Sequence, residues 1–194
     1  DHTIMILGFS FYNSGMYKEA IPWLEKSKLK TDGNAEKSLL EMMMVAYEKT
    51  ENYPQARLAC TSLAEKSSGE EKKNYVYHVG ELYEKENSTT EAIAQYEKNI
   101  KLFEKDFRNY HRYAALAIQE KRYSELRPIL QKVIAIEGSS EQYIKQLAFA
   151  CQESGDKVVA VKYYKKFLYR STLPDFICRS LKILLRPFRE FPWF

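Results

Sequence analysis

Histidine, cysteine and carboxylate side chains are the groups through which this chain could bind a metal ion or catalyse a reaction. The sequence has three histidines and three cysteines. Cys60, Cys151 and Cys178 are scattered and lack the spacing of metal ligands. His78 and His111 could form a small cationic or metal site. Two histidines without a carboxylate pattern are a weak ligand set, however, and we expect them to line a binding surface instead.

Signatures of catalysis are also missing. No phosphate-binding loop, nucleophile elbow or metalloprotease motif occurs in the sequence. Carboxylates such as Glu84, Glu86 and Glu91 recur where solvated surface groups are expected. We therefore predict that the chain is not an enzyme and has no catalytic, cofactor-binding or metal-binding residues.

A repeated pattern organises the elements that would position any site. A small or apolar anchor residue recurs at intervals of 36, 36, 34 and 34 residues, and an apolar or aromatic residue follows it four positions later. The anchors are Ala20, Ala56, Ala92, Leu126 and Ala160. A fixed period of this length is typical of stacked helical hairpins.

The segment before each anchor supports this interpretation. It carries apolar residues with the spacing i, i+3, i+4 and i+7, which places them on one face of a helix. These sets are Ile4, Leu7, Gly8, Phe11; Leu40, Met43, Met44, Tyr47; Val76, Val79, Gly80, Tyr83; Tyr110, Tyr113, Ala114, Ala117; and Ile144, Leu147, Ala148, Cys151. The third member is small in four of the five sets, which allows two helices to approach closely.

These residues resemble the tetratricopeptide repeat, and the resemblance covers about residues 1–172. The departures are Leu126 in place of an alanine, and larger residues such as Asn99 near the end of the repeat. The resemblance implies an all-α fold, a right-handed α-solenoid of about five hairpins with a C-terminal capping helix. The expected repeats are 1–34, 37–70, 73–106, 107–140 and 141–172, followed by an amphipathic helix and aromatic tail at 173–194.

Turn residues predict where the hairpins reverse. Clusters of Asn, Ser, Gly, Thr and Asp lie at 13–15, 50–52, 87–90 and 154–156, and a weaker signal lies near 121–122. Pro22 follows closely after the first turn, so we expect the regular part of that helix to begin late or to bend there.

Charge is distributed unevenly along the chain. Residues 1–100 carry 12 Lys/Arg and 16 Asp/Glu, whereas residues 101–194 carry 18 and 10. The basic half could steer an acidic partner, although the simpler interpretation is that lysines and arginines solvate outer helix faces. We see no membrane-spanning run and no signal peptide, and the chain begins with Asp1 at the start of a repeat. We therefore expect a cut or processed protein in the cytoplasm.

The resemblance implies that the first helices of the hairpins line a concave, peptide-binding groove. The residues expected to face it are Met5, Phe9, Tyr12, Asn13, Met42, Val45, Tyr77, His78, Glu81, His111, Arg112, Lys145 and Phe149. Their aromatic, methionine and basic side chains suit a peptide or protein partner with apolar anchors and acidic character. The alternative for each residue is that it only packs against a neighbouring repeat.

The sequence argues against two other classes of ligand, a chaperone C-terminus and nucleic acid. Some members of the family bind the C-terminal carboxylate of a chaperone through Lys, Asn and Arg at fixed groove positions, and here Glu41 reverses the required charge at the first of these. Nucleic acid could bind the basic half through Tyr110, Tyr113 and Tyr123. These tyrosines fall largely at core positions of the repeat, so we do not expect nucleic acid.

The tail leaves three roles open. It carries an apolar stripe formed by Ile177, Leu181, Leu184, Leu185 and Phe188. It could cap the solenoid, lie on a membrane surface or dock a partner, or associate with a neighbouring copy of the chain. We favour the cap for residues 175–186.

The leading hypothesis is a non-enzymatic scaffold or adaptor that binds a peptide or protein segment in its groove. The alternatives are a membrane- or envelope-associated assembly factor anchored by its tail, and a targeting or regulatory domain of a larger enzyme.

Overall fold

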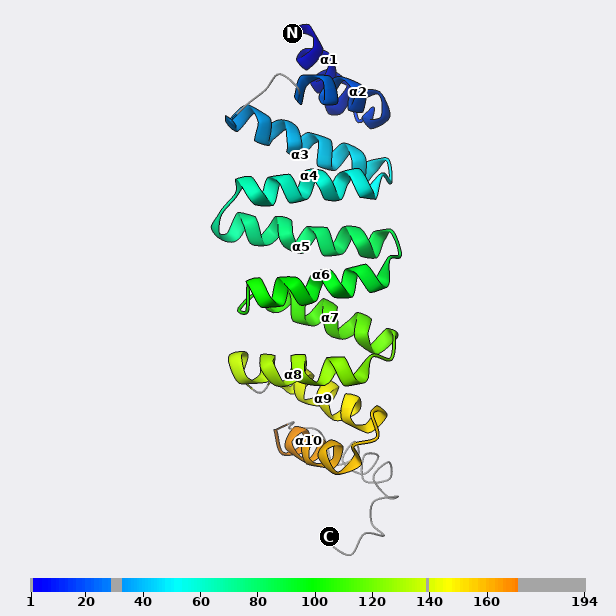
Figure 1. Cartoon of the computed structure of the whole chain (residues 1–194), viewed down its shortest axis with the longest axis vertical. Coiled ribbons are helices and arrows are strands. Elements are labelled where there is room, and N and C mark those ends of the chain that lie inside the picture. Colours follow the sequence, from blue (N-terminus) through cyan, green and yellow to red (C-terminus); the bar gives the residue numbers. More distant parts are fainter. Residues whose placement is uncertain (1, 29–32, 139, 171–194) are drawn as a thin grey trace, which may run out of the picture. The chain divides into compact units, whose positions relative to one another are not determined.

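The structure is a computed structural model that describes residues 2–28, 33–138 and 140–170. Within these ranges it contains ten helices and no strands, so the predicted all-α fold is confirmed (Figure 1). The helices are α1 His2–Asn13, α2 Tyr17–Lys28, α3 Gly33–Lys49, α4 Tyr53–Lys66, α5 Gly69–Lys85, α6 Thr89–Leu102, α7 Phe107–Gln119, α8 Tyr123–Glu137, α9 Glu141–Glu153 and α10 Lys157–Arg170. The expected capping helix and aromatic tail, residues 173–194, lie outside the described residues.

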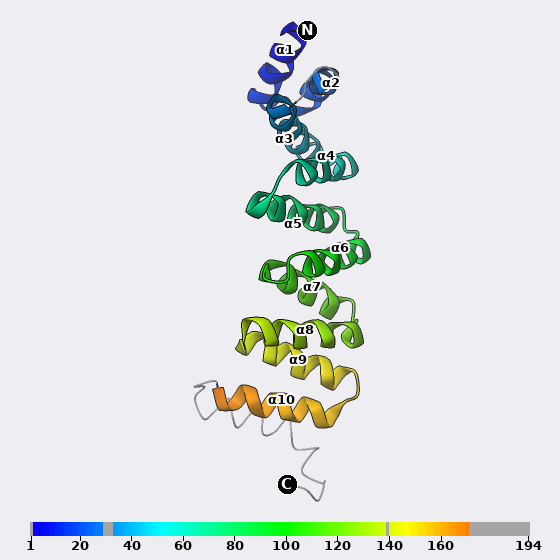
Figure 2. The same cartoon turned by 60° about the vertical axis from the view of Figure 1, so that its left-hand side comes forward.

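The chain divides into two compact units. The first unit comprises residues 1–109 and the second begins at Tyr110. In the first unit each of the helices α1 to α5 packs against the next helix along the chain, and the series ends with α5 on α6, as Figure 2 also shows. In the second unit α8 packs against α9 and α9 against α10. Packing between sequence neighbours is typical of solenoids, in which one hairpin cannot bury its apolar face alone.

The five hairpin turns share one hydrogen-bond pattern. In each turn an N–H donates to the carbonyl oxygen five residues earlier, as from Met16 to Phe11 at 2.9 Å and from Asp156 to Cys151 at 2.9 Å. The residue just before that N–H has a positive φ. These residues are Gly15, Glu51, Asn87, Lys121 and Gly155, spaced like the sequence anchors. This is the Schellman arrangement, which ends a helix and satisfies its last carbonyl groups.

One of the two alternatives predicted for Pro22, a late start of the second helix, is wrong. Helix α2 begins at Tyr17 and runs through Pro22, so its regular part does not begin after the proline. The side chain of Pro22 is exposed. The proline lies in the second turn of the helix, where it removes one backbone donor and leaves the rest of the helix in place.

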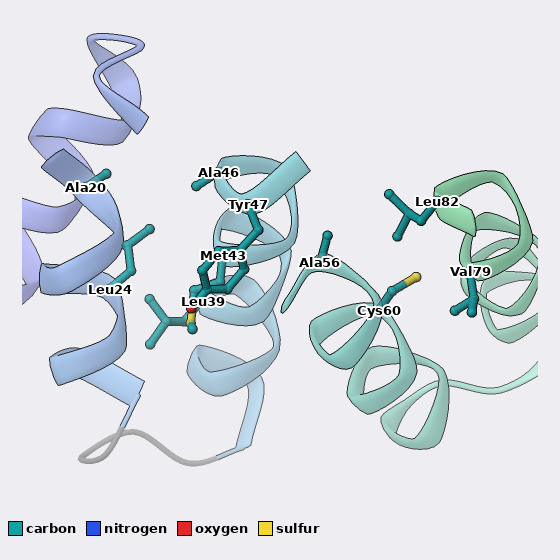
Figure 3. Close-up of a cluster of buried hydrophobic side chains, with 10 residues drawn as sticks. All are labelled: Ala20, Leu24, Leu39, Met43, Ala46, Tyr47, Ala56, Cys60, Val79 and Leu82. Atoms are coloured by element: carbon teal, nitrogen blue, oxygen red, sulfur yellow. The ribbon is translucent and has the colours of Figure 1, made fainter. Parts of the chain in front are cut away.

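The repeat anchors form the core, as the sequence predicts. All five are buried, with at most 1% of each side chain exposed. In the first unit Leu24 of α2 lies next to Leu39 of α3, Ala20 lies one turn away on α2, and the buried row continues along α3 (Figure 3). Cys60 of α4 lies on the side that faces α5, and it is a free, buried cysteine. The apolar rows therefore bury the face that each helix presents to its neighbours.

Gly80 of α5 lies very close to Tyr96 of α6 within the third hairpin. A Cβ atom at this position would lie 2.5 Å from Cε1 and 2.6 Å from Cζ of Tyr96. Tyr96 is fully buried, and its hydroxyl donates a 2.6 Å hydrogen bond to Glu84. The ring cannot move aside easily, so α5 and α6 can pack at this spacing only with glycine at position 80.

Asn99 replaces the small residue that usually ends the repeat, and it is fully buried. Its Nδ2 donates to the carbonyl oxygen of Val76 at 3.0 Å and to Oδ1 of Asn109 at 2.9 Å. Its Oδ1 accepts a hydrogen bond from Gln95 at 2.8 Å. The amide therefore joins α5, α6 and the first residues of α7 within the first unit.

We expect Gly80→Ala to lower the free energy of unfolding by about 1–3 kcal/mol, because overpacking a rigid site costs that much. The better helix propensity of alanine recovers only about 1 kcal/mol. Urea unfolding monitored by circular dichroism measures the difference. Gly8→Ala is the matched control and should lose less, because its nearest atom is a methyl group of Leu24 at 3.1 Å. Unchanged or increased stability of Gly80→Ala would contradict the packing argument.

We expect Asn99→Ala to destabilise the first unit by about 1–3 kcal/mol, because it leaves buried polar partners without a hydrogen bond. The double variant Asn99→Leu/Asn109→Leu should cost less than the sum of the single variants Asn99→Leu and Asn109→Leu, because it removes both partners together. Urea unfolding of the four proteins forms a double-mutant cycle. Strict additivity would show that the two amides are not coupled.

Candidate functional site

The predicted binding residues lie on the first helices of the hairpins, and the unit boundary divides them into two sets. The first-unit face comprises Met5, Phe9, Tyr12, Asn13, Met42, Val45, Tyr77, His78 and Glu81. The second-unit face comprises His111, Arg112, Lys145 and Phe149. None of these thirteen residues is buried, but only Asn13, His111, Arg112 and Lys145 are classed as exposed. Among these residues the structure joins His78 to Glu81 directly, at 2.9 Å.

The apolar members of the first-unit face are largely used in packing. Phe9, Tyr12 and Met42 are half-buried against the core cluster of that unit. Tyr12 also meets Tyr17 edge to face, with ring centroids 5.6 Å apart. These contacts agree with the alternative that some predicted groove residues mainly support the neighbouring helices.

The charged members of the first-unit face are tied to one another. His78 on α5 places Nδ1 2.9 Å from Glu81 and Nε2 2.9 Å from Glu48 of α3. Lys85 forms an ion pair with the same Glu48. The hydrogen bond with Glu81 raises the pKa of His78; partial burial opposes this rise, and Glu48 adds to it. Partial burial alone would raise the pKa of Glu48, but the hydrogen bonds from Lys85 and His78 hold it below its usual value.

Further carboxylates on these helices accept hydrogen bonds from tyrosines. The Tyr75 hydroxyl donates to Glu41 at 2.7 Å, which joins α5 to α3. Partial burial, followed by this bond to a carboxylate, raises the pKa of Tyr75 above its ordinary value. The Tyr47 hydroxyl donates to Glu25 at 2.5 Å, which joins α3 to α2. The sequence analysis missed these pairs, because their members lie more than 20 residues apart.

Arg108 is likewise engaged within the first unit. Its guanidinium donates to both carboxylate oxygens of Asp106 at 2.8 Å and to Asn74 at 2.9 Å. It also lies over the ring of Tyr77, 4.9 Å from the centroid. Because Arg108 and Glu41 are both held by internal partners, the structure offers no chaperone-tail clamp at these two positions.

The second-unit face has a different character. His111 stacks on the buried Tyr143 of α9, with ring centroids 5.0 Å apart and planes at 26°. Phe149 meets Tyr123 edge to face at 5.6 Å. Lys145 is exposed on α9, and α7 contains no acidic residue. This face therefore combines exposed cations with aromatic rings that are held in fixed orientations.

Two polar atoms on α9 lack a hydrogen-bond partner in the part of the chain that the structure describes. They are the Tyr143 hydroxyl and the Oε1 atom of Gln146, both buried. Unpaired buried polar atoms are costly, and they are more common at sites of function than elsewhere. Gln146 lies next to Lys145 on the same helix, and its carbonyl oxygen can only accept a hydrogen bond.

Other chemistries find little support in the described residues. No group of three His, Cys, Asp or Glu side chains among them is arranged to hold a metal ion. Tyr110 and Tyr113 are at most 2% exposed, so the expectation that they are core residues is confirmed and they cannot stack on bases. Among the described helices, none has the length and apolar character needed to span a membrane.

Comparisons with known proteins identify the same repeat. The family described as Tetratricopeptide repeat matches residues 28–180. The solved structure of MamA AMB-1 is 16% identical, covers 84% of this chain and 87% of that chain, and has a TM-score of 0.54. Another MamA structure is 17% identical and covers 89% and 97% of the two chains, with a TM-score of 0.53. The TPR-like repeats of a protein named as a Podosopora anserina kinesin light chain are 15% identical, cover 87% and 93%, and have a TM-score of 0.51.

At these identities the solved structures share the fold alone. A search of curated protein sequences gave no significant match.

Proposed function

Because the chain belongs to the tetratricopeptide repeat family, we propose that it is a non-catalytic scaffold that binds a segment of a partner protein on the first helices of its hairpins. Stacked helical repeats present extended surfaces of this kind, and the fold is typical of protein-interaction scaffolds. The observation that carries the proposal is the second-unit face, where cations and fixed aromatic rings lie together without nearby carboxylates on α7.

The charge of the second unit favours an acidic partner. Its residues 110–168 carry ten Lys/Arg and six Asp/Glu. Two of the cations are paired away from this face, since Arg122 binds Glu125 and Arg127 binds Asp156 at 2.9 Å. Lys145 lies on the first helix of its hairpin and can meet an acidic side chain of the ligand. An attraction between exposed charges mainly speeds encounter and selects the partner, and it weakens as salt is added.

An extended segment also fits the neutral groups of this face. Phe149 and the His111 ring, which is stacked on Tyr143, offer apolar surface for an aromatic or aliphatic anchor. Aromatic groups supply much of the affinity at protein interfaces, while main-chain hydrogen bonds fix an extended ligand. The proposed ligand is therefore an acidic segment with at least one apolar anchor.

We expect peptides selected from a random displayed library to be acidic and to contain an aromatic or aliphatic residue. Lys145→Glu should weaken a selected peptide roughly 5- to 30-fold, as for a loss of about 1–2 kcal/mol. Fluorescence anisotropy at low and high salt measures this effect. Lys162→Glu is the matched control, because it makes the same charge change at an exposed position on the second helix α10. Selection of neutral or basic peptides, or equal weakening by both variants, would contradict the proposal.

The membrane-associated alternative rests on residues 173–194 and stays a prediction. Co-sedimentation with anionic liposomes, using the whole chain and a chain that ends at residue 172, tests it. Lipid binding by the whole chain that the shortened chain lacks would favour a membrane role. If neither protein binds lipid and the shortened chain has the lower melting temperature, the cap is favoured. The role as a regulatory domain of a larger enzyme also remains a hypothesis.

A further inference from the structure

His78 is held between two carboxylates that come from different hairpins. Nδ1 lies 2.9 Å from Oε2 of Glu81 on its own helix α5, and Nε2 lies 2.9 Å from Oε2 of Glu48 on α3. A neutral imidazole carries one N–H, so it can donate to only one of these oxygens. Only the doubly protonated ring can donate to both at once. The geometry therefore matches the imidazolium form.

The partly buried surroundings of the ring strengthen its contacts with the two carboxylates. The side chains of His78 and Glu48 are each 22% exposed, so water screens their contact less than it would screen a fully exposed pair. Lys85 is the other cation of the cluster, and it pairs with Glu48. The protonated cluster is thus electrically balanced, with two carboxylates and two cations. Loss of the histidine proton leaves one negative charge in excess.

Several titratable or charged groups on the other helices packed on α5 are neutral or have partners outside the cluster. On α4, burial followed by the two cluster carboxylates raises the pKa of Cys60 to about 12, so its thiol stays neutral. Arg57 of α4 reaches Glu86 instead of the cluster. On α6, Lys101 pairs with Glu97. The charge state of His78 is therefore decided by its own cluster.

We propose that Glu48, His78 and Glu81 form a protonation-dependent tie between the second and third hairpins. The protonated ring joins α3 to α5 across the first-unit face. When the ring loses its proton, one nitrogen presents a lone pair to a carboxylate oxygen, and the contact changes from attraction to repulsion. The two hairpins then hold together by their apolar packing, by the Tyr75–Glu41 hydrogen bond and by the ion pairs of Lys85 with Glu48 and of Lys37 with Glu71. This tie lies in the first unit and does not depend on the ligand proposed above.

The direction of the pH response follows from the sign of the shift. The cluster raises the pKa of His78 in the folded chain above the value of about 6.5 expected for the unfolded chain. Its contribution to stability is therefore complete below about pH 6.5 and disappears as the pH rises through the higher folded-state value. A change of pH across this raised pKa would therefore alter both the tie and the charge of this face.

Nuclear magnetic resonance of the ¹⁵N-labelled histidine rings in the whole chain tests the proposal directly. The His78 ring should titrate above the value of a histidine in an unstructured peptide, and both ring nitrogens should be protonated near neutral pH. Glu48→Gln and Glu81→Gln should each lower that pKa, because each removes one carboxylate acceptor while keeping the side-chain shape. A His78 pKa at or below the peptide value, or one that neither variant changes, would overturn the proposal.

Thermal unfolding between about pH 6 and pH 9 supplies the second readout. The wild type should lose more stability over this range than His78→Gln does. His111→Gln is the matched control, because it removes a histidine from the second unit and should leave the wild-type response intact. Identical pH profiles for the wild type and His78→Gln would show that the tie does not contribute to stability. The measurement on the wild-type ring remains decisive even if one of the variants fails to fold.

Discussion

The close approach of small and large residues between neighbouring helices is the contact on which the rest of this structure depends. Gly80 leaves room for the Tyr96 ring, and the small anchors Ala20 and Ala56 are fully buried. A single hairpin has too little apolar surface to fold alone, so each helix must bury its row against the next one in the chain. This requirement explains why neighbours in sequence are neighbours in space, and why the first helices keep one face outside the core.

Polar groups then decide how those uncovered faces differ. In the first unit several carboxylates on the first helices bind internal partners, as in the pairs of Glu41 with Tyr75 and of Glu48 with His78. Buried or half-buried polar groups must be paired, since an unpaired one costs about 1–3 kcal/mol. In the second unit α7 has no acidic residue to pair with the cations beside it. The charged residues predicted for the first-unit face therefore include a carboxylate with an internal partner, whereas those predicted for the second-unit face, Arg112 and Lys145, are exposed cations.

Local signals were read from the sequence more reliably than contacts between helices. Four turn positions followed from clusters of Gly, Asn, Ser, Thr and Asp, and a Schellman turn lies at each of them; the fourth turn, at Lys121, had only a weak signal. Pro22 was misjudged because a proline was assumed to delay the helix, whereas an exposed position in the second turn tolerates it. The role of His78 was only partly foreseen, because its partner Glu48 lies 30 residues away and on another hairpin. No local pattern indicates which of several carboxylates a side chain will meet.

By itself the sequence determined the fold class, the repeat, the turns and the buried anchor residues. All of these depend on periodicity and on interactions within about five residues, which are written directly in the order of the amino acids. Only the tertiary structure decided that Arg108 is held by Asp106, that Asn99 joins three helices, and that the predicted binding residues fall into two sets with different charge balance. These outcomes depend on the spacing and rotation of packed helices, which set side-chain distances to within an ångström and which a one-dimensional pattern does not specify.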